Sequence, residues 1–366
     1  MDARADEPGS AEPVRLDLGV SAPGPGIGPR WRVPLLVLGF ASLALGIAGG
    51  LSRLMPAVPA LPGAIALHGA VMVSGFLGTV IGLERAVALG RPWAYLAPLG
   101  AGLGGAAVLS GIAIPGLFLM AAGAAAFCAA SLAVAARQLS LETVALLAGA
   151  VAWLAGCAFL GAGWPAEPWW IAFLALTIAA ERLELSRYLK RSEFSRTSFG
   201  ALAAGIALSA LDASMKIQGA LLTLLALWLF AFDLARITVR QHGLARYVAL
   251  CLLAGYFWLG VAGVLFAAGA LRDAALHAFF LGFVFSMVFG HAPVILPAVL
   301  RISLPYQPIL YVPLALLHGS LAVRVAGAIS YGAWGNAAAA ALFILTAATL
   351  AIRASSARPR RSAPAR

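Results

Sequence analysis

A succession of long apolar runs, separated by short polar breaks, is the feature that most constrains this chain. Roughly 20 apolar residues cross a bilayer as a helix, and a helix bonds its own backbone polar groups where lipid offers none. No series of alternating ten-residue segments suggests a transmembrane barrel. The runs predict an all-α polytopic membrane protein with about twelve transmembrane helices. The expected spans are residues 33–51, 62–83, 95–114, 117–136, 143–163, 169–189, 199–211, 217–235, 245–269, 274–297, 309–328 and 334–352.

The composition excludes an ordinary soluble protein. Only 11% of the residues are charged, the mean hydropathy is +0.94, and soluble domains carry about 25% charged residues. The three cysteines lie inside apolar runs without CxxC spacing, which argues against a disulfide framework or a zinc site. The net charge of +11 comes from arginines at the expected helix ends, so we interpret it as an orientation signal and expect no nucleic-acid partner.

Three regions are expected. Residues 1–32 are rich in Pro, Gly and Ala and predict a disordered cytosolic segment with no cleaved signal peptide. Residues 33–353 form the twelve-span domain, and residues 354–366 form a basic cytosolic tail.

The basic residues predict the orientation. With the N-terminus inside, 21 Lys and Arg residues fall on the inner side and three on the outer side, with Arg324 inside the eleventh span. This split predicts a bacterial-type inner membrane protein with both termini in the cytoplasm. It also supports the short seventh span at residues 199–211, since the inner arginines of the next loop would otherwise lie outside.

Short matches suggest an internal repeat. Leu83-Glu84-Arg85 ends span two and Ala180-Glu181-Arg182 lies in span six, while Leu67-His68 and Leu276-His277 open spans two and ten. These matches are compatible with three four-helix repeats, although such short matches also arise by chance in a chain rich in Ala, Leu and Gly. The two Glu-Arg dipeptides are expected to form structural ion pairs at the inner interface.

Four of the five histidines lie within predicted spans, where an ionisable side chain is a functional candidate because lipid offers it no partner. His242 is the exception, in a predicted cytosolic loop. His68 and His277 lie at similar depth, about 9 Å and about 5 Å into their spans at 1.5 Å per residue. His291 follows His277 on nearly the same face of an ideal helix. The depths predict an outer pair, His68 and His277, and an inner pair, His291 and His318.

The outer pair suggests a haem. A haem with two axial histidines fills a gap between helices and needs only two imidazole nitrogens. Copper also binds imidazole, but no third histidine or cysteine is close in the pattern. Arg324, near the outer end of span eleven, is expected to pair with the haem propionates; the alternative is that it extends to the membrane surface.

The inner pair, His291 and His318, is the candidate for a second site. Pro293 and Pro297 loosen the backbone beyond His291. This pair is expected to bind a metal ion, or a small ligand such as nitric oxide at a second haem. The alternative is a hydrogen bond between helices.

The run His68-Gly69-Ala70-Val71-Met72 resembles the His-Gly-x-x-Met signature in helix two of haem-copper oxidase subunit I. This resemblance implies that His68 is an axial ligand of a low-spin b-type haem. His277 matches a ligand of that family only by helix number and depth. The chain is also similar to the nitric-oxide-response NnrS proteins, which are twelve-span proteins associated with haem and copper. The resemblance implies a role in nitric oxide response or membrane electron transfer, with nitric oxide or a redox protein as partner in addition to the lipid bilayer.

The chain departs from the oxidase pattern in one respect that matters. Oxidases carry copper-binding histidines on spans six and seven, and these predicted spans contain none. An oxidase-type dinuclear copper site is therefore not expected. The competing interpretations are a twelve-span secondary transporter, suggested by the loop from Gly82 to Arg91, and a membrane assembly factor.

Overall fold

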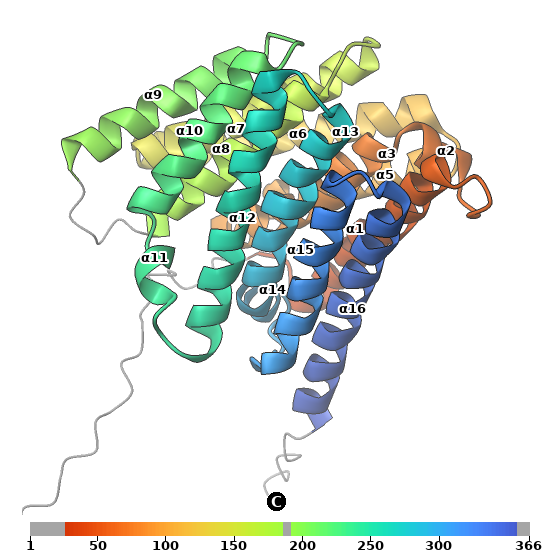
Figure 1. Cartoon of the computed structure of the whole chain (residues 1–366). Helices are drawn as coiled ribbons and strands as arrows, with labels where there is room; N and C mark the ends of the chain where they lie inside the picture. The colour runs from red at the N-terminus through yellow and green to blue at the C-terminus, as the bar shows by residue number, and fades with distance from the viewer. Residues whose placement is uncertain (1–25, 186–191, 357–366) are drawn as a thin grey trace, which may run out of the picture.

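The computed structural model describes residues 26–185 and 192–356 of the 366-residue chain, and these residues form helices without any strand (Figure 1). The helices are α1 (Pro29–Leu54), α2 (Pro62–Ala66), α3 (His68–Ala70), η1 (Val71–Gly78), α4 (Thr79–Leu89), η2 (Pro92–Tyr95), α5 (Leu96–Leu109), α6 (Ala113–Arg137), α7 (Leu141–Gly161), α8 (Glu167–Leu185), α9 (Glu193–Ser209), α10 (Lys216–Phe232), α11 (Ala235–Thr238), α12 (Gly243–Ala268), α13 (Arg272–His277), η3 (Ala278–Val284), α14 (Phe285–Leu300), η4 (Pro308–Leu310), α15 (Tyr311–Val325) and α16 (Ile329–Ser356).

The all-α fold class is confirmed, and each predicted span overlaps a helix over most of its described residues. Within the described residues, eight helices are long and apolar enough to cross a membrane, which is consistent with a helical membrane protein. The four predicted spans outside this set are α5, α8, α9 and α10. Of these, α5, α9 and α10 are short, at 14, 17 and 17 residues, and α8 carries Glu or Arg near both ends.

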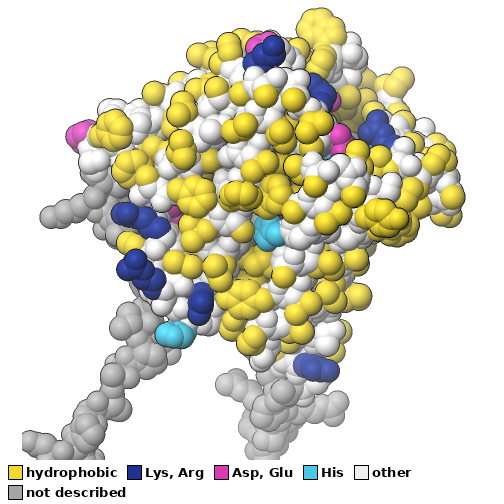
Figure 2. Space-filling view, viewed as in Figure 1, with side chains coloured by type: hydrophobic (Ala, Val, Ile, Leu, Met, Phe, Trp, Pro, Cys, Tyr) yellow, Lys and Arg dark blue, Asp and Glu magenta, His cyan; other side chains and the backbone are white. Residues whose placement is uncertain are grey.

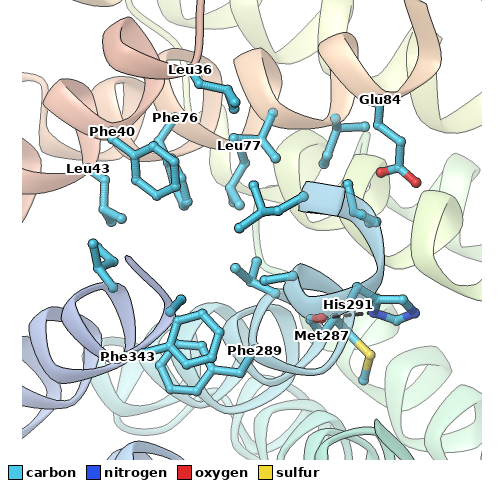
Figure 3. A pocket seen from close by; sticks show the side chains of 18 of the residues that line it. Leu36, Phe40, Leu43, Phe76, Leu77, Glu84, Met287, Phe289, His291 and Phe343 are labelled. Carbon is cyan, nitrogen blue, oxygen red and sulfur yellow. Dashed lines mark hydrogen bonds between the residues drawn. The ribbon is translucent and has the colours of Figure 1, made fainter. Parts of the chain in front are cut away.

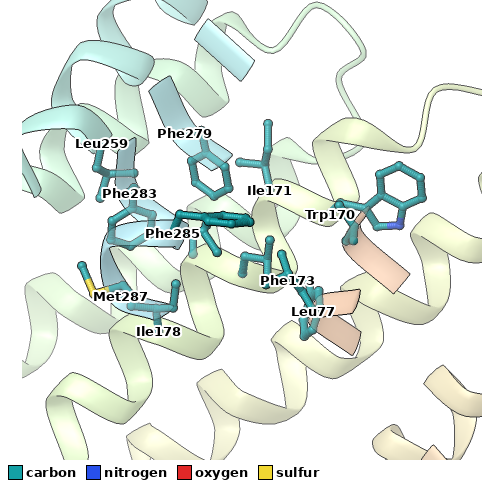
Figure 4. Close-up of a cluster of buried hydrophobic side chains, with 14 of the residues drawn as sticks. Leu77, Trp170, Ile171, Phe173, Ile178, Leu259, Phe279, Phe283, Phe285 and Met287 are labelled. Atoms are coloured by element: carbon teal, nitrogen blue, oxygen red, sulfur yellow. The ribbon is translucent and has the colours of Figure 1, made fainter. Parts of the chain in front are cut away.

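Helix α8 is surrounded by protein, which explains how a segment with charged ends sits in this bundle. Its residues from Ile171 to Ala175 are almost completely buried. Figure 4 shows its side chain Ile171 beside Phe279 of η3, and its Phe173 beside Leu77 of η1, within one apolar cluster. Because its apolar surface is covered by neighbouring helices and not by lipid, α8 does not need the hydropathy of a lipid-facing span.

The outer surface has the distribution expected of a membrane-embedded bundle. Figure 2 shows hydrophobic side chains across the middle of one face, with Lys and Arg side chains toward its upper and lower margins. Exposed large apolar residues occur on nearly every long helix, for example Phe118 on α6 at 73% and Phe257 on α12 at 56% exposure. Contiguous apolar surface of this kind on a water-soluble protein would be unusual.

Helices α1 and α16 pack antiparallel, so the described chain enters and leaves the bundle at the same end. Trp334 Nε1 at the start of α16 lies 3.1 Å from Met55 Sδ, just beyond the end of α1. At the other end, Arg32 in the first turn of α1 donates from Nη1 to the Val299 carbonyl at 2.8 Å.

The boundaries of the end regions differ in part from the prediction. Helix α1 begins at Pro29, so the last residues of the predicted 1–32 segment are helical, because the Arg32 side chain is anchored to the backbone near the end of α14. Residues 1–25 of that segment lie outside the described part of the chain. At the C-terminus, α16 continues to Ser356, and residues 357–366 of the predicted tail are also outside the described residues. The inner end of the predicted sixth span falls within 186–191, which is likewise not described.

Two π-helical segments interrupt the bundle at corresponding places. The segment η1 (Val71–Gly78) begins three residues after His68, and η3 (Ala278–Val284) begins directly after His277. A π-helix has i→i+5 hydrogen bonds and often marks a functional site. The same local structure after both histidines agrees with the expected equivalence of spans two and ten, and the threefold repeat itself stays a prediction.

Candidate functional site

A cavity of about 650 Å³ lies among α1, α3, η1, α8, α13, η3 and α16. Its polar lining residues are His68, His277, Arg53, Arg272, Arg324, Asp273, Glu167, Trp170 and Asn336. The three residues predicted to form the outer site, His68, His277 and Arg324, therefore line one space. We call this space the outer cavity.

The ring of His68 is fixed in one tautomer. Its Nδ1 lies 2.8 Å from the carbonyl oxygen of Gly46 on α1. A carbonyl only accepts, so Nδ1 carries the proton and donates, which leaves Nε2 of the neutral ring with a lone pair. The ring fits there because α1 has a glycine beside it: a Cβ on Gly50 would lie 2.7 Å from His68 Cε1.

His277 is held in the same way. Its Nδ1 lies 2.8 Å from the carbonyl oxygen of Asp273, one turn earlier, and 3.2 Å from the Oδ1 of the same residue. Nδ1 is again the donor and Nε2 the free acceptor. Histidines that bind metals usually donate their other ring nitrogen to a carbonyl or carboxylate, which sets tautomer and orientation. Both outer histidines show this arrangement.

Arg324 has a partner within the chain. Its guanidinium bonds the Asp273 carboxylate through Nε at 3.3 Å and through Nη2 at 3.1 and 3.2 Å. Arg324 is only 7% exposed, and it lines the cavity that holds both histidines. From the sequence we expected the anionic partner of Arg324 to be a haem propionate, and Asp273 was not singled out. The available signal was an acidic residue at the same predicted outer end, four residues before His277.

Asn336 supplies an unpaired acceptor at the outer cavity. Its Nδ2 donates to the Leu317 carbonyl at 3.1 Å and to Ser320 Oγ at 2.7 Å. Its buried Oδ1 has no hydrogen-bond partner among the described residues. Buried polar atoms are nearly always paired, so this oxygen marks a position where a bound molecule could donate. No sequence pattern singled out Asn336.

The predicted inner pair does not form one site. His318 accepts from Trp258 Nε1 at its Nδ1, at 2.9 Å. Its Nε2 lies 3.3 Å from Ser286 Oγ, whose own proton goes to the Gly282 carbonyl at 2.6 Å. Both ring nitrogens of His318 are thus occupied, and neither has a lone pair for a metal. His318 acts as a hydrogen-bonded packing residue between α12, α14 and α15.

His291 lines a different space. Its Nδ1 donates to the Met287 carbonyl at 2.8 Å, so its Nε2 is free. The assumption that His277 and His291 share one helical stripe fails because η3 lies between them, and a π-helix takes more residues per turn than an α-helix. The two residues line different cavities.

This second space, the inner cavity, has a volume of about 680 Å³ and lies between α1, η1, α4, α8, α14 and α16. Most of its wall is apolar, and Glu84, Glu181, Arg182 and His291 are its ionisable lining residues. Figure 3 shows Glu84 and His291 toward one end of the cavity and Phe40, Phe76, Phe289 and Phe343 farther along it. Leu77, Phe285 and Ala340 line both cavities.

The two Glu-Arg dipeptides take part in ion pairs as expected, with the exception of Glu84. Arg85 lies 3.6 Å from Glu181, across the two helices, and Arg182 binds Asp233 at 3.0 Å. Glu84 therefore remains without an ion pair among the described residues.

No group of three or more His, Cys, Asp or Glu side chains is placed to hold a metal ion in residues 26–185 and 192–356. A ligand set that needs three or four side chains, as for zinc or copper, is not assembled in this part of the chain. A haem iron needs only two axial side chains, since the macrocycle supplies the other four nitrogens.

Comparison with known families gives one match. Residues 32–352 match the family described as Domain of unknown function (DUF8744). The chain belongs to this family. The match includes nearly all of α1 to α16 and every residue that lines the two cavities. No curated protein and no solved structure matches the chain.

Proposed function

We propose that this family member is an integral membrane haem-binding protein, with a low-spin b-type haem held between His68 and His277. One observation carries the proposal: both imidazoles line the outer cavity, and each has Nδ1–H fixed by a carbonyl and Nε2 free. This is the tautomer that an axial ligand of iron requires.

The outer cavity fits such a group in size and charge. Its volume of about 650 Å³ lies within the 300–1,000 Å³ typical of ligand sites. Three arginines and two carboxylates line it, and the Arg272–Glu167 pair at 3.3 Å and the Arg324–Asp273 pair use both carboxylates. Arg53 adds a further positive charge and Nη1 of Arg324 has no partner among the described residues, so acidic propionates would meet donors.

When bound, a haem supplies one-electron redox chemistry or a coordination site for a diatomic gas. The presence of two histidines, His68 and His277, favours one-electron redox chemistry. If His68 and His277 both held the iron, they would leave no coordination position for a gas, so membrane electron transfer is supported better than direct capture of nitric oxide. A role in nitric oxide response, as the NnrS-like resemblance implies, would need His68 or His277 to be displaced. The ligand sets favour haem over copper.

The proposal includes twelve spans in a bacterial-type inner membrane with both termini in the cytoplasm. The 21 to 3 distribution of basic residues supports the orientation. The entry and exit of the described chain at one end of the bundle support an even number of crossings.

The test is a reduced-minus-oxidised spectrum of the purified full chain, with haem quantified as the pyridine haemochrome. We expect the α and β bands of a six-coordinate b-type haem in the wild type, and loss of these bands in His68→Ala and in His277→Ala. His242→Ala is the matched control, because His242 is exposed in the loop before α12. A colourless, folded wild type expressed with added haem precursor would overturn the proposal, and so would full haem content in both cavity variants.

A second candidate is a transporter of a small anion, favoured by the outer cavity's lining of three arginines against two carboxylates. A transporter of this kind has no visible absorption and binds its anion in the absence of haem. The same spectrum therefore separates it from the haem protein. An assembly factor, the remaining alternative, is also expected to be colourless but would lack saturable binding of a small anion.

A further inference from the structure

The inner cavity has the shape and lining of a lipid site. Its long walls are built from Leu, Val, Ile, Phe and Ala side chains of α1, η1, α14 and α16. Phe289 and Phe343 stack in parallel with ring centroids 3.9 Å apart on one wall. On α1, Val33 and Val37 line the cavity while 46% and 59% exposed, so the cavity adjoins the surface that would face lipid. A volume of about 680 Å³ is large enough for a bound small molecule.

The polar end of this cavity offers acceptors. Glu84 makes no hydrogen bond or ion pair with another described residue, and the Nε2 of His291 has a lone pair because its Nδ1 donates to Met287. The Glu181 carboxylate lies beside them with its Arg85 contact at 3.6 Å.

The cations near this end are already engaged. Arg85 contacts Glu181, and Arg182 makes a two-bond pair with Asp233 at 3.0 and 3.2 Å. An anionic phosphate head group would therefore meet no unengaged guanidinium among the described residues at this end. Burying the phosphate charge without a cationic partner would be costly.

We propose that the inner cavity binds an uncharged lipid whose head group bears hydroxyl groups. One hydroxyl donates to the Glu84 carboxylate, a second hydroxyl, where the head group has one, donates to His291 Nε2, and an apolar tail lies along the wall formed by α1, α14 and α16. Two kinds of membrane molecule share this chemistry: diacylglycerol-type neutral lipids and long-chain hydroquinones. The inference does not depend on haem, since no residue of the outer histidine pair takes part.

The test is lipid binding to the full chain in detergent, measured by native mass spectrometry. Dioleoylglycerol, dodecyl hydroquinone and dioleoyl phosphatidic acid are titrated separately. We expect saturable one-to-one binding of at least one hydroxyl-headed probe and at least tenfold weaker binding of phosphatidic acid. The probe that binds more tightly shows whether the cavity prefers a diacylglycerol-type lipid or a long-chain hydroquinone.

Variants locate the site. Glu84→Leu and His291→Leu should each weaken binding of the preferred probe by about tenfold, in line with the loss of a hydrogen bond to a charged or strong acceptor. Ala347→Phe should block the tail, because Ala347 lines the cavity and is almost fully buried. Glu193→Leu and His242→Leu are matched controls on exposed positions and should bind normally.

Two results would overturn the proposal: phosphatidic acid binding as tightly as the hydroxyl-headed probes, or normal binding by Ala347→Phe together with both polar variants. Absence of saturable binding by all three probes would also overturn it. Thermal unfolding of each variant shows whether it is folded, and if Glu84→Leu is not, Glu84→Gln replaces it. Repeating the titration with His68→Ala separates this result from the haem proposal, since that variant should lose haem and keep lipid binding.

Discussion

At the scale of single residues, ring-nitrogen partners distinguish the histidines better than depth does. Similar depth in two spans that run in the same direction grouped His68 with His277, and both residues line the outer cavity. Depth failed for His318, whose partners Trp258 and Ser286 come from two other helices. The face that a helix turns toward each neighbour depends on the rotation and packing of the helices. These cannot be read from a single, uniformly apolar sequence.

His318 is expected to contribute to stability and not to cofactor binding. His318→Leu should lower the free energy of unfolding by about 1–3 kcal/mol, because it leaves Trp258 Nε1 without its acceptor. Thermal unfolding in detergent measures the change. Trp258→Phe combined with His318→Leu should cost less than the sum of the single changes. A loss of haem in His318→Leu with unchanged stability would contradict the assignment.

Asp273 is expected to be the residue on which the order of the outer cavity depends. Asp273→Asn leaves the nearly buried Arg324 guanidinium without its anion. We expect a loss of about 1–2 kcal/mol, less than for a fully buried pair because Asp273 is half exposed. The change should also lower haem retention, since the Asp273 carboxylate contacts His277 Nδ1 at 3.2 Å and helps to orient that ring.

Chemical unfolding and haem content of the same sample measure both effects. Arg324→Met combined with Asp273→Asn should recover much of the stability, because no unpaired charge remains. Equal stability of Asp273→Asn and wild type would show that the pair contributes nothing.

At the scale of elements, apolar runs located each described helix of 14 residues or more, whereas no pattern in these runs indicated the π-helical segments η1 and η3. A π-helix arises when packing favours an extra residue in a turn, so its signal lies in the neighbours. Glycines allow close contact between other helices of the bundle. On α5 and α6, a Cβ at Gly104 would lie 2.7 Å from both the Gly116 oxygen and Met120 Cγ. Small residues allow backbones to approach in this way.

The contact between α5 and α6 gives the element-scale prediction. Gly104→Val should force these helices apart and lower the free energy of unfolding by about 1–3 kcal/mol or more, measured by thermal unfolding. Gly319→Ala on α15 is the control: nothing lies within 4 Å of its added Cβ, so it should be neutral or slightly stabilising. Equal free energies of unfolding for Gly104→Val and Gly319→Ala would contradict the close packing of α5 and α6.

At the scale of the whole molecule, the number of crossings rests on the shortest helices. Helices α9 and α10 have 17 residues each, or about 26 Å at 1.5 Å per residue, slightly less than the roughly 30 Å of a bilayer core. Hydropathy alone left the seventh span, which is α9, the weakest of the twelve. The distribution of arginines favoured it, because without that single span Arg236, Arg240 and Arg246 would lie outside.

Reporter insertions test this topology. A reporter after Asp212, between α9 and α10, is expected to report the outer side, and one after Gln241, before α12, the cytoplasm. Alkaline phosphatase and fluorescent-protein fusions read the two sides in opposite senses. Two cytoplasmic signals would make α9 and α10 a re-entrant or peripheral pair, and the molecule would then have ten spans.

Leu77, Phe285 and Ala340, which line both cavities, form a partition only one side chain thick. A molecule on one side that changes the rotamer of Phe285 also reshapes the other side, so the two binding equilibria share one free-energy term. Thermodynamic linkage requires that term to be reciprocal. Whatever factor an occupant of the inner cavity applies to affinity in the outer one, the outer occupant applies to the inner.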